Sequence, residues 1–170
     1  MHKHYYFFFL VFTAISVWVF AGAGMPRNFL SVYALNIGQG DAIFIETPGR
    51  HQIVIDGGPD TRVLSELSSV MPFWDRSIDL IVLTHPQEDH MFGLIEVLRR
   101  YDVANVMMTG VNYHTRTYEE FKKAVKEEGA RVIIAHAGKN IRLDDGVEMD
   151  ILFPVNTMDG KDALADVNDT

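Results

Sequence analysis

The stretch Thr84-His85-Pro86-Gln87-Glu88-Asp89-His90 directly follows the apolar run from Ile78 to Leu83 (IDLIVL). Such a continuous apolar run is typical of a strand that is buried on both faces of a sheet. Pro86 disfavours helical torsion angles at His85, so the stretch begins extended and the side chains of His85 and Gln87 point to the same side. The sequence therefore predicts that polar side chains converge at the carboxyl end of a buried strand, where α/β sheets tend to bind ligands.

The residue types in this stretch favour a metal site. The chain has seven His, 23 Asp and Glu, and no Cys, so thiolate sites and disulfides are excluded and imidazole and carboxylate remain as ligands. Such ligands suit Zn²⁺, with Mn²⁺ or Fe also compatible, and the metal could make a bound water nucleophilic near neutral pH. The alternative is a solvated polar loop with two surface histidines. The candidate metal ligands are His85, Gln87, Asp89 and His90, with Asp89 also the candidate catalytic carboxylate.

Short apolar runs separated by turn residues predict the elements around this stretch. Further strands are expected at residues 30–36, 41–47, 51–56, 103–108, 131–135 and 148–153. Gly38-Gln39-Gly40 would form a tight turn between the first two of these strands. Helices are expected from an N-cap at Asp60 to Met71, after the polar stretch through Leu94 and Leu98, and over residues 118–128. Strands that alternate with helices in this order predict an α/β (α+β) fold.

Residues near the ends of two strands are candidates for supporting the site. The strand from His51 to Asp56 runs straight into Gly57-Gly58, which places the Asp56 carboxylate at a sheet edge beside a sharp or close-approach turn. Asp41, at the end of the Gly-Gln-Gly-Asp turn, could approach the site or cap the hairpin. Structural support is therefore expected from Asp56, Gly57, Gly58 and Asp41.

Other polar residues are expected to lie outside the site. His51, His114 and His136 have no partner at ligand spacing and are predicted to be surface or packing residues. A set of basic residues could contact phosphate, but its lysines alternate with glutamates, which favours a salt-bridged, solvated helix face. The set comprises Arg99, Arg100, Lys122, Lys123 and Lys126.

The first residues differ from the rest of the chain. Residues 5–24 contain no charged residue and are about long enough to cross a hydrocarbon core, so residues 1–24 are expected to be a signal peptide or a signal-anchor helix. Lys3 favours a cytoplasmic N-terminus, which would place residues 25–170 outside the cytoplasm, either anchored to a bacterial cell membrane or secreted. The net charge of −8 disfavours unspecific attraction to phosphate, so a nucleic-acid substrate would need a basic patch or the metal itself.

The polar stretch resembles the H-x-H-x-D-H signature of the metallo-β-lactamase superfamily. The segments Asn36 to Ala42 and Val54 to Gly58 resemble the branch of the ComEC-type competence DNA-uptake channel, and the resemblance covers about residues 30–170. It implies the N-terminal half of an αββα sandwich, a centre with two metal ions, and hydrolysis of a substrate such as a phosphodiester in DNA. In that family's pattern, Asp56 buttresses the metal loop, His85 binds the first metal, and Asp89 and His90 bind the second.

The sequence also departs from the family pattern. Gln87 stands where the signature has its second His, and a neutral amide is a weak ligand that should weaken the first site. The family's later ligands would lie beyond Thr170, and Val167 to Thr170 resembles the opening of the next strand block. We therefore expect a fragment that is inactive alone, from a longer hydrolase. The alternative is a non-catalytic or degenerate binding domain at the cell surface, and no protein partner can be inferred.

Overall fold

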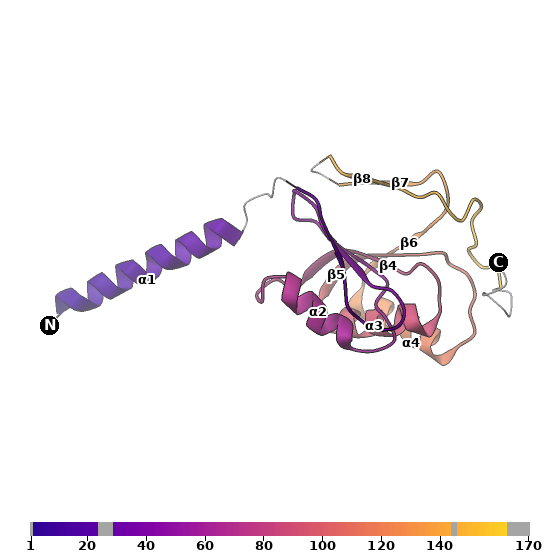
Figure 1. Cartoon of the computed structure of the whole chain (residues 1–170), viewed down its shortest axis with the longest axis horizontal. Coiled ribbons are helices and arrows are strands. Elements are labelled where there is room, and N and C mark those ends of the chain that lie inside the picture. Colours follow the sequence, from indigo (N-terminus) through magenta and orange to yellow (C-terminus); the bar gives the residue numbers. More distant parts are fainter. Residues whose placement is uncertain (1, 24–28, 144–145, 163–170) are drawn as a thin grey trace.

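The computed structural model describes residues 2–23, 29–143 and 146–162. Helix α1 (His2–Ala23) occupies the apolar N-terminal segment and stands apart from the other elements in Figure 1. Across these described ranges, no helix is both long enough and apolar enough to cross a membrane. The strand block expected at Val167 to Thr170 lies outside the described residues.

A six-stranded sheet forms the centre of the fold, and its strands lie side by side in chain order. The first three strands are antiparallel neighbours, whereas the pairs from β3 to β6 are parallel. The strands are β1 (Ser31–Ala34), β2 (Ile43–Glu46), β3 (Gln52–Ile55), β4 (Ser77–Val82), β5 (Asp102–Met108) and β6 (Arg131–Ile134). Because β3 and β4 are adjacent and parallel, their carboxyl ends meet at the same edge of the sheet.

Three helices cover one face of the sheet, as Figure 1 shows. They are α2 (Arg62–Val70), α3 (Glu88–Leu98) and α4 (Arg116–Glu128), and each presents an apolar stripe to the sheet. The main core lies between these two layers, where each fully buried large apolar side chain contributes about 1.5–3 kcal/mol. Its members include Phe44, Val54, Leu67, Ile81, Leu94, Val106 and Phe121.

The opposite face of the sheet carries a smaller apolar cluster. Strands β7 (Asn140–Arg142) and β8 (Glu148–Asp150) form an antiparallel hairpin over this face. Figure 1 shows the hairpin on the side of the sheet away from α2, α3 and α4. Alternate residues of the sheet strands point here, among them Ile53, Leu80 and Met107. Both faces of the parallel strands are therefore apolar, as the continuous apolar run before the polar stretch predicted.

The predicted strands and helices are present, although the strand expected over residues 148–153 ends at Asp150. Three further differences concern other elements. Residues 35–42 connect β1 to β2, a longer connection than the tight turn expected, although the two strands do pair as a hairpin. The N-cap of α2 is Thr61 rather than Asp60, because the chain is still non-helical at Asp60, whose carboxylate accepts a hydrogen bond from the Arg62 amide at 2.8 Å. Strand β7 was not predicted, since its single apolar residue gives no alternating pattern.

Candidate metal centre

The candidate site begins where β3 and β4 end. Ile55 pairs with Val82 in the parallel ladder, and the Asp56 amide continues this ladder by donating to the Val82 carbonyl at 2.9 Å. Asp56 and Thr84 therefore leave the sheet next to each other. The two segments come together only through the register of the sheet, because they are far apart in the chain.

The Asp56 carboxylate accepts hydrogen bonds from two other residues of the site. One of its oxygens accepts a hydrogen bond from the Thr84 amide at 2.9 Å. The other accepts from the Thr84 hydroxyl at 2.6 Å and from His90 Nδ1 at 2.9 Å. Asp56 is only 3% exposed and has a φ of 56°, in the left-handed region that Asp tolerates better than most residues. These three hydrogen bonds hold it in that conformation.

The two imidazoles of the site each have a hydrogen bond at Nδ1. His90 Nδ1 bonds to Asp56, and His85 Nδ1 lies 2.9 Å from the Thr84 hydroxyl oxygen. Because the Asp56 carboxylate can only accept, His90 Nδ1 carries the proton and the neutral imidazole of His90 has its lone pair on Nε2, the atom that a metal would use. His85 Nε2 instead faces the acceptor oxygen of Gln87. The two imidazole rings lie 3.9 Å apart between centroids.

Gln87 and Asp89 complete the polar group. Gln87 Oε1 lies 2.9 Å from His85 Nε2, so the predicted placement of these two side chains on one side is confirmed. Gln87 is the N-cap of α3, and Asp89 lies in the first turn of that helix. Asp89 Oδ1 is 4.0 Å from His90 Nε2, and its side chain is 48% exposed. Its carboxylate thus reaches the metal-facing nitrogen of His90 from the solvent side.

Backbone contacts between glycines hold the start of α3 against the strand ends. The Gly57 amide donates to the His90 carbonyl at 2.7 Å, and the Gly93 amide donates to the Gly58 carbonyl at 3.0 Å. A Cβ at Gly93 would lie 1.9 Å from the Gly57 carbonyl oxygen. The backbones can approach this closely only without side chains. The role of Gly93 was not predicted from the sequence, where the signal for it is a glycine inside an apolar helical pattern.

The loop between β1 and β2 also supports the site, through its backbone. Gly40 has a φ of +76°, and a Cβ there would lie 1.9 Å from the Asp89 carbonyl oxygen. Asp41, which was expected to support the site or cap the hairpin, has an exposed side chain. The support that the structure shows from this loop therefore comes from Gly40.

The arrangement fits a metal ion held by nitrogen and oxygen atoms. Ligand atoms of Asp56, His85 and His90 all lie within 4.8 Å of one another. Because both Asp56 oxygens already accept hydrogen bonds from Thr84 or His90, we assign Asp56 to orienting these residues rather than to direct ligation. The side chains left to hold an ion are those of His85, Gln87, Asp89 and His90.

The remaining histidines and basic residues lie apart from this centre. His51 Nδ1 contacts Asp79 at 3.2 Å, and His136 Nδ1 contacts the Ala137 carbonyl at 2.9 Å. The predicted salt-bridged face of α4 is confirmed by ion pairs that include Lys122–Glu119 at 2.7 Å and Lys123–Glu127 at 3.6 Å. Arg99 and Arg100 both pair with Glu96. Four of the five basic residues considered for phosphate contact thus form ion pairs with neighbouring carboxylates.

Comparison with solved structures shows the fold. The first B3 metallo-beta-lactamase with an active-site glutamic acid is 22% identical, with a TM-score of 0.50, and the match covers 69% of this chain and 47% of that one. The Rm3 metallo-beta-lactamase is 16% identical, with a TM-score of 0.46, and the match covers 71% of this chain and 46% of that one. The chain thus spans about half the length of these two structures. No curated protein matches the chain.

The family model of the metallo-beta-lactamase superfamily matches residues 35–161. This range contains β2 to β8, helices α2 to α4 and every residue of the candidate metal centre. Members of this superfamily are generally metal-dependent hydrolases, in agreement with the nitrogen and oxygen ligands found at the ends of β3 and β4. From the polar stretch, the strand ends that position it and this match, we conclude that the chain belongs to the metallo-beta-lactamase superfamily.

Proposed function

We propose that the protein carrying this domain is a metal-dependent hydrolase that cleaves a phosphodiester bond, most concretely in DNA. The observation that supports hydrolysis best is the meeting of His85 and His90, whose rings lie 3.9 Å apart between centroids, with Asp89 Oδ1 4.0 Å from His90 Nε2. A metal ion bound there would supply an activated water and stabilise negative charge on the substrate. Zn²⁺ suits this ligand set, and two ions in the complete domain are part of the proposal.

The chain's own residues have distinct parts in this proposal. His90 and Asp89 would hold one ion, and His85 with the weaker Gln87 would help to hold another. Asp56 keeps the His90 proton on Nδ1, and it also holds the Thr84 hydroxyl, which contacts His85 Nδ1. The neutral imidazole of His90 is therefore ready to bind an ion through Nε2 without first changing tautomer.

The substrate class is supported by the segments Asn36 to Ala42 and Val54 to Gly58, which resemble the competence DNA-uptake branch. With a net charge of −8 and most nearby basic residues paired, the chain offers little unspecific attraction for DNA. The ion itself would then be the main group that receives a phosphate.

The test measures metal content and hydrolysis in the full-length protein. We expect stoichiometric metal by elemental analysis and cleavage of bis(p-nitrophenyl) phosphate and of single-stranded DNA. His85→Ala should lower the rate by about 100-fold or more, since the loss of a metal ligand removes the activated water. The matched control is His51→Ala, which removes a histidine at the opposite end of β3 and should leave the rate unchanged. Equal rates for the two variants would refute the assignment of the site.

A second candidate function follows from Gln87, which occupies a position where a stronger ligand would be expected. The domain would then keep the fold as a non-catalytic module that binds DNA. In that case DNA would shift the protein in an electrophoretic mobility assay, while no cleavage product would form with Zn²⁺ or Mn²⁺ supplied. Cleavage that depends on His85 would exclude this second function.

A further inference from the structure

The edge strand β6 has one side that the sheet leaves open. Among the residues that the structure describes, it pairs only with β5, and the Ala135 amide bonds to the Met108 carbonyl at 2.8 Å. Backbone groups alternate in direction along a strand, so the polar backbone groups of Val132 and Ile134 point to the free edge. The Ile134 carbonyl already accepts a hydrogen bond from Lys139 Nζ at 2.7 Å. The open groups are therefore centred on Val132, whose residue surface is 43% exposed.

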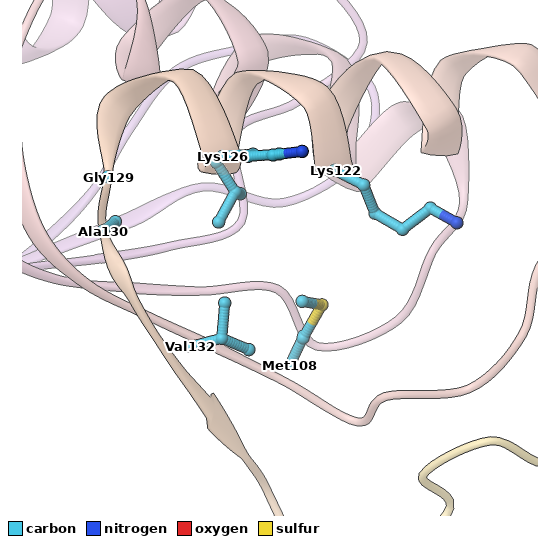
Figure 2. Close-up of a pocket in the computed structure, with 7 residues that line it drawn as sticks. Met108, Lys122, Lys126, Gly129, Ala130 and Val132 are labelled. Carbon is cyan, nitrogen blue, oxygen red and sulfur yellow. The ribbon is translucent and has the colours of Figure 1, made fainter.

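An apolar pocket lies on the helix face of this edge. Its volume is about 430 Å³, and Val132 from β6 and Met108 from β5 form its floor. Figure 2 shows Lys122 and Lys126 extending from α4 above these two side chains, with Ala130 at the end of the pocket where α4 leads into β6. A side chain entering from the free edge would meet apolar atoms, with ammonium groups around the rim.

A second pocket lies on the other face of the same edge. Its volume is about 270 Å³, and it separates β6 from the β7–β8 hairpin. The apolar lining comes from both the sheet and the hairpin, while Arg131 and Lys139 supply positive charge. The lining apolar residues are Met107, Ile133, Ala135, Ile141 and Ile151. One strand edge is thus flanked on both faces by a pocket that has an apolar floor and basic residues.

The charge along this edge is opposite to that of the chain. The chain carries a net charge of −8, yet the two pockets are lined by Lys122, Lys126, Arg131 and Lys139. Lys122 pairs with Glu119 at 2.7 Å. Within the described parts of the chain, the other three basic residues form no ion pair with a carboxylate. A local excess of unpaired positive charge favours a partner with carboxylates.

We propose that the free edge of β6 binds an extended acidic segment of a partner protein, which adds to the sheet as a further strand. The backbone of that segment would bond to Val132, and its side chains would alternate between the two faces. Apolar side chains of the segment would enter the two pockets, and its carboxylates would face the basic residues. This docking surface is separate from the metal centre, so the proposal does not depend on the hydrolase activity.

The probe is the fluorescein-labelled heptapeptide Val-Val-Glu-Glu-Val-Val-Glu, which as a strand presents both Val and Glu on each face, titrated with the full chain and followed by fluorescence anisotropy. We expect saturable binding that Lys126→Glu weakens on the order of tenfold, because the substitution replaces attraction by repulsion at the rim. Lys123→Glu is the matched control, since it makes the same charge change on α4 at a residue paired with Glu127. Equal weakening by both variants, or no binding below about 1 mM, would overturn the proposal.

A second variant tests the backbone pairing. In Val132→Pro the missing N–H is one that faces the free edge, so the β5–β6 ladder keeps its hydrogen bonds while the added strand loses one. We expect Val132→Pro to abolish peptide binding, Val132→Thr to retain it, and circular dichroism to show both variants folded. In the native chain, the peptide should slow hydrogen exchange at the amides of residues 132 and 134.

Two other outcomes would also overturn the proposal. If the basic residues only protect the edge from self-association, Lys126→Glu would form oligomers in size-exclusion chromatography and the native chain would not bind the peptide. If a second copy of the chain covers the edge, the native protein would be dimeric and Val132→Pro would make it monomeric, again without peptide binding.

Discussion

Two His–Asp pairs lie at opposite ends of the same two strands, and they differ in nearly every other respect. At the carboxyl end, His90 contacts Asp56 at 2.9 Å, and the two side chains are 10% and 4% exposed. At the amino end, His51 contacts Asp79 at 3.2 Å, and the exposures are 26% and 41%. A pair of residue types therefore says little by itself about function.

The difference lies in what surrounds each pair. The buried pair shares its carboxylate with Thr84 and has a second imidazole 3.9 Å away, so that several ligand atoms converge. The exposed pair has no second histidine in contact among the described residues, and Asp79 instead accepts a hydrogen bond from the Gln52 amide at 2.7 Å. Convergence and burial, rather than the presence of His and Asp, distinguish a candidate metal centre from a surface contact.

The largest expected effect comes from adding a side chain at Gly93, where the backbone of α3 contacts the carboxyl end of β3 next to the metal centre. Gly93→Ala places a Cβ 1.9 Å from the Gly57 carbonyl oxygen, so α3 must move away from the strand ends. We expect a loss of about 4 kcal/mol in the free energy of unfolding, measured by urea denaturation. Gly129→Ala, which meets nothing within 4 Å but has a φ of +77°, should cost only about 1 kcal/mol. Similar losses for the two variants would mean that the close packing is not needed.

Removing the carboxylate of each His–Asp pair tests directly whether the two pairs differ in function. Asp56→Ala leaves the Thr84 amide, the Thr84 hydroxyl and His90 Nδ1 without their acceptor, and should cost about 3 kcal/mol of stability. Zinc affinity should fall by about 10- to 100-fold, because the imidazoles lose their orientation. Asp79→Ala should cost about 1 kcal/mol and leave zinc affinity unchanged, as measured by competition with a chelator. A drop in zinc affinity with Asp79→Ala would contradict the distinction between the two ends.

A stronger ligand at position 87 should increase the difference in zinc binding between the two ends of the strands. Gln87→His replaces a neutral amide by an imidazole beside His85 Nε2, so zinc affinity should rise on the order of tenfold. The control is the same substitution combined with His85→Ala, in which the gain should disappear. If Gln87→His weakened zinc binding instead, Gln87 would have to be assigned a role other than that of a weak ligand.

The smallest expected effect concerns Asp75, near the amino end of β4. Burial disfavours the Asp75 carboxylate, but hydrogen bonds from Ser77 and Gln52 outweigh it and lower the pKa of Asp75 below its ordinary value of 3.8. This stabilisation is therefore complete above about pH 4 and is lost as the pH falls through the lowered pKa. Asp75→Asn should cost about 1 kcal/mol at pH 7 and less at pH 3, measured by urea denaturation at both pH values. An equal cost at both values would show that ionisation of Asp75 does not contribute.

Much of the metal end could be predicted because its signals are local. The apolar run before Thr84, the proline after His85 and the strand that ends at Asp56 each specify a short piece of backbone. The sequence alone did not reveal that the Thr84 hydroxyl links Asp56 to His85, since this contact requires the register between β3 and β4. It also gave no reason to connect Gly40 with Asp89, or Gly93 with Gly57.

The sequence by itself determined the order of strands and helices, the family pattern and the candidate ligands, because periodicity and ligand type are properties of neighbouring residues. Only the tertiary structure decided which His–Asp pair is buried, which glycines allow close backbone approach, and that the basic residues of α4 and β6 line two pockets at one free edge. The physical reason is that burial, tautomer and pocket shape depend on residues brought together across the sheet, and sequence spacing does not contain those distances.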